Sequence, residues 1–479
     1  MSIAVVKPSY SSSPASAAAS RTGAATATAG TGPLLAVTGQ NLQAPLIQGG
    51  SVRYANLDYA ASAPALCDVV DYLALVLPYY ASVHRGAGFA SQVSTSVYEN
   101  ARDTVRAFVG GRADDAVIFT RNTTDSLNLL AGCVADIVAD SSADVVYLDI
   151  EHHANLLPWQ RLPHRSVPAG TSLAATLARL ETEFQAGSVA LLAVTGASNV
   201  TGEILPIAAL AALAHRYGAR IVVDAAQLAP HRKINIAADG IDYVVFSGHK
   251  LYAPFGSGVL VGRPDWLDAG PPHLAGGGAV KEARLDSVSW ATGPARHEGG
   301  SPNVLGAATL AKAAEILAVL DPQQLQDHET NLHRELVNGL EGLPGVTVHR
   351  LFTDSGKFPG SGTIAVVNFS VAGYDSGLVA AYLSAEHGVG VRDGRFCAHP
   401  LLRRLGLPSG SLRASFGAGS CTEDAQRLIA GVAALLESGL GWDYVVDSGR
   451  WVPADDARSF PQWAPNTPGT AGAAPCSTQ

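Results

Sequence analysis

The stretch Ile221-Val-Val-Asp224, followed by Tyr243-Val-Val-Phe-Ser247-Gly-His-Lys250, decides the fold of this chain. Each part is a short apolar run with polar residues directly after it. Runs of this length that are rich in valine and isoleucine are typical of buried strands. We therefore expect the carboxylate of Asp224, the hydroxyl of Ser247 and the amine of Lys250 to lie along one edge of a sheet.

Similar apolar runs recur between segments of helix length, at 117–120, 145–148 and 190–194. This alternation favours an α/β fold with a mostly parallel sheet that is covered on both faces. A smaller α+β domain is expected after Pro302, beginning with the Ala-rich helix at 306–320. The predicted division is a tail, a large domain whose N-terminal segment packs on the small domain, the small C-terminal domain and an extension, at 1–40, 41–305, 306–440 and 441–479.

Both ends of the chain have unusual compositions. Residues 1–40 are rich in Ala, Ser, Thr and Gly, which predicts disorder because too little apolar surface is available to offset the ordering entropy. An organelle transit peptide is the alternative for this tail. The extension mixes Pro, Gly and Ala with Trp451 and Trp463, so we expect part of it to pack and its end to be disordered.

The overall composition bounds the function. A length of 479 residues with 47% hydrophobic content suffices for a large core and a smaller one. The net charge of −9 argues against nucleic acid or an anionic membrane as a partner. No apolar run reaches the roughly 20 residues that span a bilayer. The five cysteines are scattered and predict neither a zinc site nor a disulfide framework, so we expect a cytoplasmic protein without a metal.

Asp224, Ser247 and Lys250 together match the needs of pyridoxal phosphate (PLP). This cofactor requires a lysine that bonds it covalently, an acid beside its pyridine nitrogen and donors for its phosphate. The acid keeps the ring nitrogen protonated, so that the ring accepts electrons from a breaking substrate bond. Taken singly, Asp224 is also explained as a turn residue and Lys250 as a surface lysine.

Other polar segments follow the remaining strands, where ligands gather in open α/β sheets. Arg121-Asn-Thr-Thr-Asp125 opens a helix, whose backbone N–H groups attract a phosphate, and Thr123 and Thr124 add hydroxyls. Ordinary N-capping is the alternative. Glu151-His-His-Ala-Asn155 carries adjacent histidines, which do not share a helix face and therefore predict no metal site. Ser198-Asn-Val-Thr-Gly202 is by itself a turn signal.

Three motifs carry a resemblance to a known family. Val223-Asp-Ala-Ala-Gln227, Ser247-Gly-His-Lys250 and Gly256-Ser-Gly-Val-Leu resemble the lysine region of fold-type I, class V aminotransferase-like enzymes, specifically of cysteine desulfurases. The resemblance extends from about residue 56 to about residue 431. It implies a fold-type I PLP-dependent transferase with a seven-stranded, mostly parallel sheet and a smaller α+β domain. Lys250, Asp224, Gln227 and His249 are then cofactor contacts.

The same resemblance implies roles at the other strand ends. It assigns Thr124 to the phosphate and lays His152 flat against the pyridine ring, with acid–base work as a further role. Asn199 would reach the cofactor's phenolic oxygen or the substrate carboxylate, and Gln227 would donate to the same oxygen. Ser301, in Gly299-Gly-Ser-Pro-Asn303, would donate to the phosphate of a neighbouring subunit, which implies a C2 homodimer.

Two segments of the small domain bear on the substrate. Leu412-Arg-Ala-Ser-Phe416 resembles the family's Arg-Ala-Ser segment, whose arginine grips a substrate α-carboxylate. A planar guanidinium suits a bidentate carboxylate clamp, so Arg413 is the predicted anchor. Arg392 is a second predicted substrate contact. The implied substrate is cysteine or a close relative.

Gly390-Val-Arg-Asp-Gly-Arg-Phe-Cys397-Ala-His-Pro400 resembles the short cysteine loop of the Suf-type branch, where a thiolate takes the substrate sulfur as a persulfide. Arg392, Arg395 and His399 are nearby groups that favour the thiolate. The alternative for Cys397 is a small buried hydrophobe.

The loop differs from the branch pattern in two ways. Gly394-Arg-Phe-Cys397 stands where Gly-His-His-Cys is typical. Tyr374-Asp-Ser-Gly377 stands where some members carry His-Pro-His-Asp for a zinc-bearing acceptor, so that acceptor is not expected.

We therefore predict a PLP-dependent cysteine desulfurase or selenocysteine lyase that forms L-alanine from L-cysteine and passes sulfur from Cys397 to an acceptor protein. A class V epimerase or C–S lyase, in which Cys397 is not catalytic, is the enzymatic alternative. A non-catalytic relative that serves as a sulfur-transfer partner is the third interpretation.

Overall fold

Seven strands form the central sheet of the large domain in the order β4-β11-β10-β9-β7-β5-β6. The structure is a computed structural model, and it describes residues 32–84, 86–461 and 463. Only β11 runs antiparallel to its neighbours, which confirms the expected mostly parallel sheet. All the runs predicted as strands belong to this sheet. Its strands are β4 (Ala116–Thr120), β5 (Asp144–Leu148), β6 (His164–Val167), β7 (Val189–Thr195), β9 (Arg220–Asp224), β10 (Tyr243–Ser247) and β11 (Gly258–Gly262).

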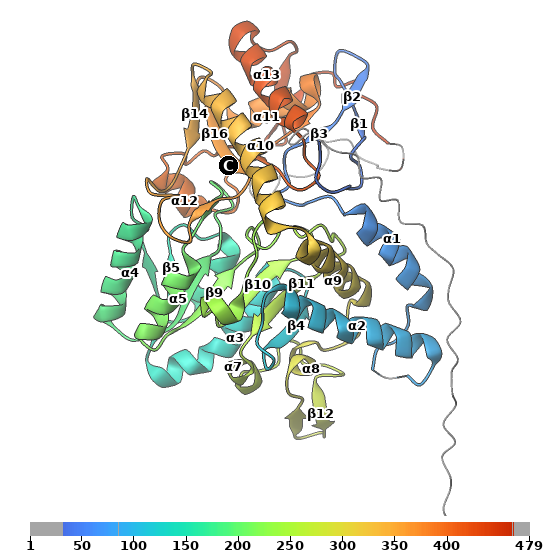
Figure 1. Ribbon diagram of the computed structural model, residues 1–479, viewed down its shortest axis with the longest axis vertical. Coiled ribbons are helices and arrows are strands. Elements are labelled where there is room, and N and C mark those ends of the chain that lie inside the picture. Colours follow the sequence, from blue (N-terminus) through green and yellow to red (C-terminus); the bar gives the residue numbers. More distant parts are fainter. Residues whose placement is uncertain (1–31, 85, 462, 464–479) are drawn as a thin grey trace, which may run out of the picture.

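The sheet is buried on both faces, because side chains alternate along each strand. In β10, Val244 and Phe246 join one core, whereas Tyr243 and Val245 join the other. Helices α3 and α7 cover one face, and α2, α4, α5 and α9 cover the opposite face (Figure 1). These helices are α2 (Phe89–Phe108), α3 (Thr123–Ser141), α4 (Leu173–Ala186), α5 (Ile207–Arg216), α7 (Pro264–Ala269) and α9 (Val304–Val319).

A four-stranded antiparallel sheet in the order β14-β16-β19-β18 forms the small domain. Its core joins the sheet to α10, α11 and α13, which lie at the top of Figure 1. The strands are β14 (Val346–His349), β16 (Val366–Val371), β18 (Arg392–Gly394) and β19 (Ser411–Ser415), and the helices are α10 (Pro322–Glu341), α11 (Ser376–His387) and α13 (Thr422–Ser438).

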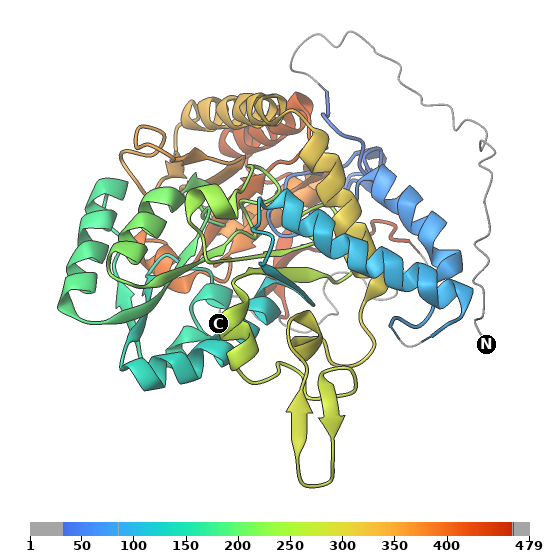
Figure 2. The same cartoon turned by 60° about the horizontal axis from the view of Figure 1, so that its bottom comes forward.

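The remaining elements are short or lie at the periphery. A hairpin formed by β12 and β13 projects from the large domain (Figure 2). The bounds of these elements are β1 (Gln43–Pro45), β2 (Ser51–Arg53), β3 (Ala55–Asn56), α1 (Cys67–Val76), β8 (Glu203–Ile204), α6 (Ile236–Asp239), β12 (Val280–Ala283), β13 (Val288–Trp290), α8 (Pro294–His297), β15 (Gly362–Thr363), β17 (Val389–Gly390), α12 (His399–Arg404), β20 (Tyr444–Asp447) and β21 (Arg450–Pro453), with 3₁₀ turns at 77–79, 153–155 and 159–161. None of the helices in the described part of the chain combines the length and apolar content that crossing a bilayer requires.

Helix α9 differs from the prediction that it opens the small domain. Val304 and Ala307 pack in a core with Tyr98 of α2, and Leu310 joins the core on one face of the large sheet. The helix is apolar on nearly every side, so its sequence gives no direction for its packing. It belongs to the large domain, and α10 is the first helix of the small one.

The N-terminal segment, residues 32–58, packs against the small domain. β3 pairs with β17 in parallel, and Asp58 forms a bridge with Ser415 at the end of β19. Residues 32–40 were expected in the disordered tail, yet Val37 is buried, and the N–H groups of Leu34 and Leu35 donate to the carbonyl of Ala418. Their apolar side chains explain the difference. The predicted tail otherwise falls on residues 1–31, which lie outside the described part.

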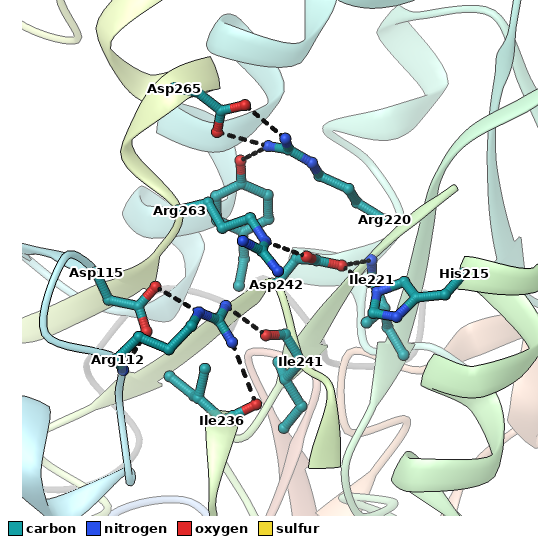
Figure 3. A network of polar contacts seen from close by, with 11 residues as sticks. Arg112, Asp115, His215, Arg220, Ile221, Ile236, Ile241, Asp242, Arg263 and Asp265 are labelled. Atoms are coloured by element: carbon teal, nitrogen blue, oxygen red, sulfur yellow. Dashed lines mark hydrogen bonds and ion pairs between the residues drawn. The ribbon is translucent and has the colours of Figure 1, made fainter. Parts of the chain in front are cut away.

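A buried carboxylate fixes the strands that carry the predicted cofactor residues (Figure 3). Asp242, just before β10, accepts hydrogen bonds from the Ile221 N–H in β9 at 3.0 Å and from Arg263, after β11, at 2.6 Å. His215 of α5 lies 2.8 Å from the same carboxylate. The network stands at the start of β9 and β10, so it holds their register from the edge opposite Asp224 and Ser247.

Candidate active site

A cavity of about 290 Å³ opens at the carboxyl ends of β4, β9 and β10 and extends to the small domain. Its volume lies near the lower end of the range for ligand pockets, about 300–1,000 Å³. Apart from Ser301, every residue predicted to bind cofactor or substrate lines it. These are Thr123, Thr124, His152, Asn199, Asp224, Gln227, Ser247, His249, Lys250, Arg392, Cys397 and Arg413.

One end of the cavity is the N-terminus of α3. The N–H of Thr123 donates to the Ser247 hydroxyl at 2.8 Å, and the two hydroxyls are 2.6 Å apart. Asn122 caps the helix by accepting from the Asp125 N–H at 3.0 Å. Gly258 lies against this turn so closely that a Cβ there would be 2.5 Å from the Asn122 Cα. Hydroxyls gathered at a helix N-terminus form a site for an anion such as phosphate.

Lys250 and Asp224 lie in the middle of the cavity. Asp224 is buried, and burial raises its pKa, while the Ala226 N–H, which donates to it at 3.0 Å, and Lys250 oppose that shift. Burial lowers the pKa of Lys250 to about 8, although Asp224 raises it. The Lys250 amine is therefore partly neutral near physiological pH, which a covalent bond to an aldehyde requires.

His152 stands beside them with its orientation fixed. Its Nδ1 accepts a hydrogen bond from the Ala154 N–H at 3.0 Å, which assigns the ring proton to Nε2. Burial, followed by Lys250 and other cations, lowers the pKa of His152 to about 3. The imidazole is therefore neutral at physiological pH. A neutral ring suits contact with a flat cofactor ring, and its low pKa makes His152 a weak base.

A buried chain of polar groups supports the turn that carries His152. Asn155 donates to the Glu151 carboxyl at 2.7 Å, and the Trp159 indole donates to Asn155 at 3.1 Å. Glu151 is fully buried, and burial raises its pKa well above the ordinary range. Glu151 and Asn155 belong to the segment for which the sequence predicts no metal role, and Trp159 follows it. Their spacing carries no signal that distinguishes such a buried network from an exposed turn.

Arg413 is held by contacts to two segments of the chain. Its guanidinium donates to the Asn199 carbonyl at 2.9 Å and to the Asp58 carboxylate at 2.9 Å. Its Nε is buried without a hydrogen-bond partner among the described residues. Burial lowers the pKa of Arg413, and Asp58 opposes that shift. Asp58 is the functional neighbour that sequence reasoning missed, because it lies in the distant segment beside β3.

The loop that carries Cys397 is anchored on both sides of the thiol. Asn199 donates to the Phe396 carbonyl at 2.8 Å, and the His153 N–H donates to the Cys397 carbonyl at 2.8 Å. Phe396 and Cys397 both have a φ of 51°, in the left-handed region that bulky residues rarely adopt. Such backbone strain costs about 1–3 kcal/mol per residue and clusters at functional sites. The loop thus places Cys397 on the cavity wall at an energetic cost.

Ser301 lies apart from this cavity, on the wall of a separate one of about 1030 Å³. Its segment is anchored at both ends. Glu298 pairs with Arg102 at 2.6 Å in a buried contact, and Asn303 donates to the Phe255 carbonyl at 2.8 Å. Within one chain, Ser301 therefore does not reach the cofactor residues, and its predicted role requires a second copy.

Comparison with known proteins identifies the family of the chain. The sequence profile of the aminotransferase class-V family matches residues 55–428. The chain belongs to this family. The motif resemblance is thereby confirmed, and PLP is the cofactor.

Similar members of the class-V family are cysteine desulfurases. The enzyme of Dickeya dadantii is 34% identical over 394 residues, which cover 81% of this chain and 92% of that protein. The enzyme of Pectobacterium atrosepticum is 33% identical over 399 residues, which cover 82% of this chain and 95% of that protein. The solved structures of cysteine desulfurase CsdA from Escherichia coli and of the cysteine desulfurase from Thermococcus onnurineus are 32% and 31% identical, with TM-scores of 0.70 and 0.73. Each alignment covers 80% of this chain and 95% of the other.

The residues in the cavity fit PLP by their chemistry. The N-terminus of α3 with Ser247 offers donors for the phosphate, and Asp224 is a buried carboxylate for the ring nitrogen. Lys250 supplies the amine that bonds the aldehyde, and Gln227 lines the wall nearby. The described residues contain no group of three or more His, Cys, Asp or Glu that would hold a metal ion.

Proposed function

We propose that this class-V protein is a PLP-dependent cysteine desulfurase that converts L-cysteine to L-alanine and retains the sulfur on Cys397. One observation carries the proposal. Lys250, Arg413 and Cys397 line a single cavity, so an amine, a carboxylate anchor and a thiol face the same small volume. The relatives described above support the reaction class.

Arg413 binds the substrate α-carboxylate in this proposal. Its Nε is unpartnered, and one of its Nη atoms pairs with Asp58, so an incoming carboxylate joins or replaces that acidic partner. A guanidinium offers parallel donors to a carboxylate, which fixes the direction of the amino acid. The substrate sulfur is then oriented toward the loop of Cys397.

When bound, PLP supplies the electron sink that makes the C–S bond of the substrate breakable. Lys250, with its lowered pKa, moves the proton at the substrate Cα. Cys397 attacks the substrate sulfur, the sulfur–sulfur bond forms as the carbon–sulfur bond breaks, and the carbon gains a proton. Two thiols become one persulfide and one methyl group, so the reaction needs no outside oxidant or reductant.

We infer a homodimer in which Ser301 completes the site of the second copy. The segment of Ser301 is anchored at both ends, and Ser301 lines a cavity other than the one that holds the cofactor residues of its own chain. Leu285, in the turn between β12 and β13, is fully exposed.

We also infer a cytoplasmic, reducing setting and a sulfur acceptor. Among the described residues, Cys67, Cys133 and Cys421 are free cysteines. A reactive thiol that forms a persulfide must be kept reduced between turnovers.

The test is incubation of the holoenzyme with L-cysteine, followed by alanine quantification and intact mass. Formation of alanine together with one added sulfur atom per chain supports the proposal. Turnover of cysteine to pyruvate, or racemisation without added sulfur, contradicts it and supports a C–S lyase or an epimerase.

A further inference from the structure

The C-terminal extension builds a second cavity next to the active site. Strands β20 and β21 form a hairpin whose turn residues, Ser448 and Gly449, have positive φ values of 49° and 76°. The hairpin is fixed to α11, because the Tyr444 hydroxyl donates to Glu386 at 2.9 Å and β21 packs along the helix. This hairpin lies beyond the residues 55–428 that match the family profile.

The second cavity has a volume of about 500 Å³. Its walls are the start of α11, strand β18 and the hairpin, whose Trp451 in β21 packs against Gly377. Arg392 and Phe396 line both this cavity and the active-site cavity. Phe396 directly precedes Cys397, so the two cavities meet at the loop that carries the thiol.

The lining of the second cavity bears charges of both signs. Arg392 and Arg450 are its cations, and Asp375 and Asp393 are its anions. The four lie close enough that Arg392, Asp375 and Arg450 all act on the pKa of Asp393. Trp451 adds an apolar surface. A small molecule with a carboxylate, an ammonium group and a short carbon chain matches these features.

We propose that this cavity binds the sulfur acceptor and that the acceptor is a small amino-acid thiol. The inference rests on the proposed function, because the sulfur must first reach Cys397. The acceptor thiolate attacks the outer sulfur of the Cys397 persulfide, the new sulfur–sulfur bond forms, and Cys397 leaves as a thiolate. The products are the acceptor persulfide and the original thiol, so no further redox partner is required.

The charges predict how acceptors are selected. Arg450 recognises the acceptor carboxylate at the outer wall, and the shared Arg392 stands between the two cavities. The ammonium group faces Asp375 and Asp393. The cavity beside the hairpin, at about 500 Å³, has room for a ligand of amino-acid size.

The experiment uses holoenzyme that has been loaded with L-cysteine and desalted. Discharge of the added sulfur is followed by intact mass with four probe thiols: homocysteine, cysteamine, 3-mercaptopropionate and 2-mercaptoethanol. Homocysteine carries both charged groups, and cysteamine carries only the ammonium group. 3-Mercaptopropionate carries only the carboxylate, and 2-mercaptoethanol carries neither. We expect homocysteine to saturate at the lowest concentration and 2-mercaptoethanol to show no saturation.

Arg450→Ala should reduce the ratio of the homocysteine rate to the 2-mercaptoethanol rate about tenfold, the effect of one lost charge-assisted hydrogen bond. Arg458→Ala is the matched control, since Arg458 lies in the same extension but pairs with Asp456 at 2.7 Å. It should leave the ratio unchanged. Equal discharge by all four thiols, or an unchanged ratio in Arg450→Ala, overturns the inference while the proposed function stands. Failure of L-cysteine to load Cys397 overturns both.

Discussion

The guanidinium of Arg413 donates to the carboxylate of Asp58 at 2.9 Å, although the two residues lie 355 positions apart in the chain. The contact joins the small-domain sheet to the segment that follows β3. It gives a buried cation a carboxylate partner in the place where a substrate carboxylate is expected. Asp58 therefore both stabilises Arg413 and competes with the amino acid.

Asp58→Asn tests this double role. The variant removes the charge that opposes the lowered pKa of Arg413, so a buried cation loses its counter-ion. We expect the melting temperature to fall. Breaking a buried ion pair lowers the free energy of unfolding by about 3–5 kcal/mol. The loss here should stay near the lower end of that range, because Asp58 is partly exposed. L-Alanine should raise the melting temperature more in the variant than in the wild type, since the ligand then supplies the only carboxylate. Equal ligand-induced shifts would show that Arg413 does not bind the α-carboxylate.

The pKa of Lys250 predicts how the apoenzyme captures PLP. Burial lowers this pKa to about 8, and only the neutral amine bonds an aldehyde. The rate of capture should rise with pH and level off above about pH 8, whereas an ordinary lysine is only about 0.4% neutral there. Asp224→Asn removes a charge that raises the pKa, so its inflection should move to lower pH. A wild-type inflection near pH 10 would contradict the buried site. Borohydride reduction and peptide mapping should locate the cofactor on Lys250.

Asp242 is predicted to stabilise the sheet beneath the site. Asp242→Asn places an amide against the Ile221 N–H and Arg263, where both carboxylate oxygens now accept hydrogen bonds. We expect a loss of about 1.5–3 kcal/mol in thermal unfolding. Asp265→Asn is the matched control in the same region, because its pair with Arg220 is exposed and should contribute less than about 1 kcal/mol. Equal losses in the two variants would contradict this assignment.

Ser301→Ala tests the composite site. Removing the hydroxyl should weaken retention of PLP during dialysis without changing how the protein sediments. Ser287→Ala, on the projecting hairpin, is the control and should retain PLP. Mixing Ser301→Ala with Lys250→Ala chains should restore part of the activity if each site takes residues from both copies. A monomer with full activity in sedimentation experiments would exclude this arrangement.

Local patterns were enough to predict the centre of the site. Asp224 ends one apolar run, and the next run leads directly into Ser247 and Lys250. Adjacent parallel strands bring such ends together, and Val245 of β10 indeed pairs with Asp224 of β9. The strand runs and the mostly parallel sheet followed from the same reasoning. The identity of the cofactor followed from the residue types at those ends.

Other features depend on contacts that no local pattern encodes. Asp58 reaches Arg413 only because β3 joins β17 of the small domain. Helix α9 was assigned to the wrong domain because an apolar surface on nearly every side does not indicate its neighbour. The hairpin of β20 and β21 is fixed by Glu386 of α11, a partner far away in the sequence.

The central claim is that Cys397 receives the substrate sulfur, and Cys397→Ser tests it most directly. Cys67→Ser is the matched control, since Cys67 is also a half-buried cysteine and lies at the start of α1, outside the lining of the cavity. Both variants should bind PLP, as judged from its absorbance, because neither removes a cofactor contact.

The deciding measurement is alanine release and intact mass after L-cysteine treatment of the wild type and both variants. We expect the wild type and Cys67→Ser to form alanine and gain one sulfur atom on Cys397. Cys397→Ser should lose both products together, by more than the roughly 10²–10⁴-fold range of acid–base catalysis, because the nucleophile itself is gone. Undiminished alanine formation by Cys397→Ser would contradict the account.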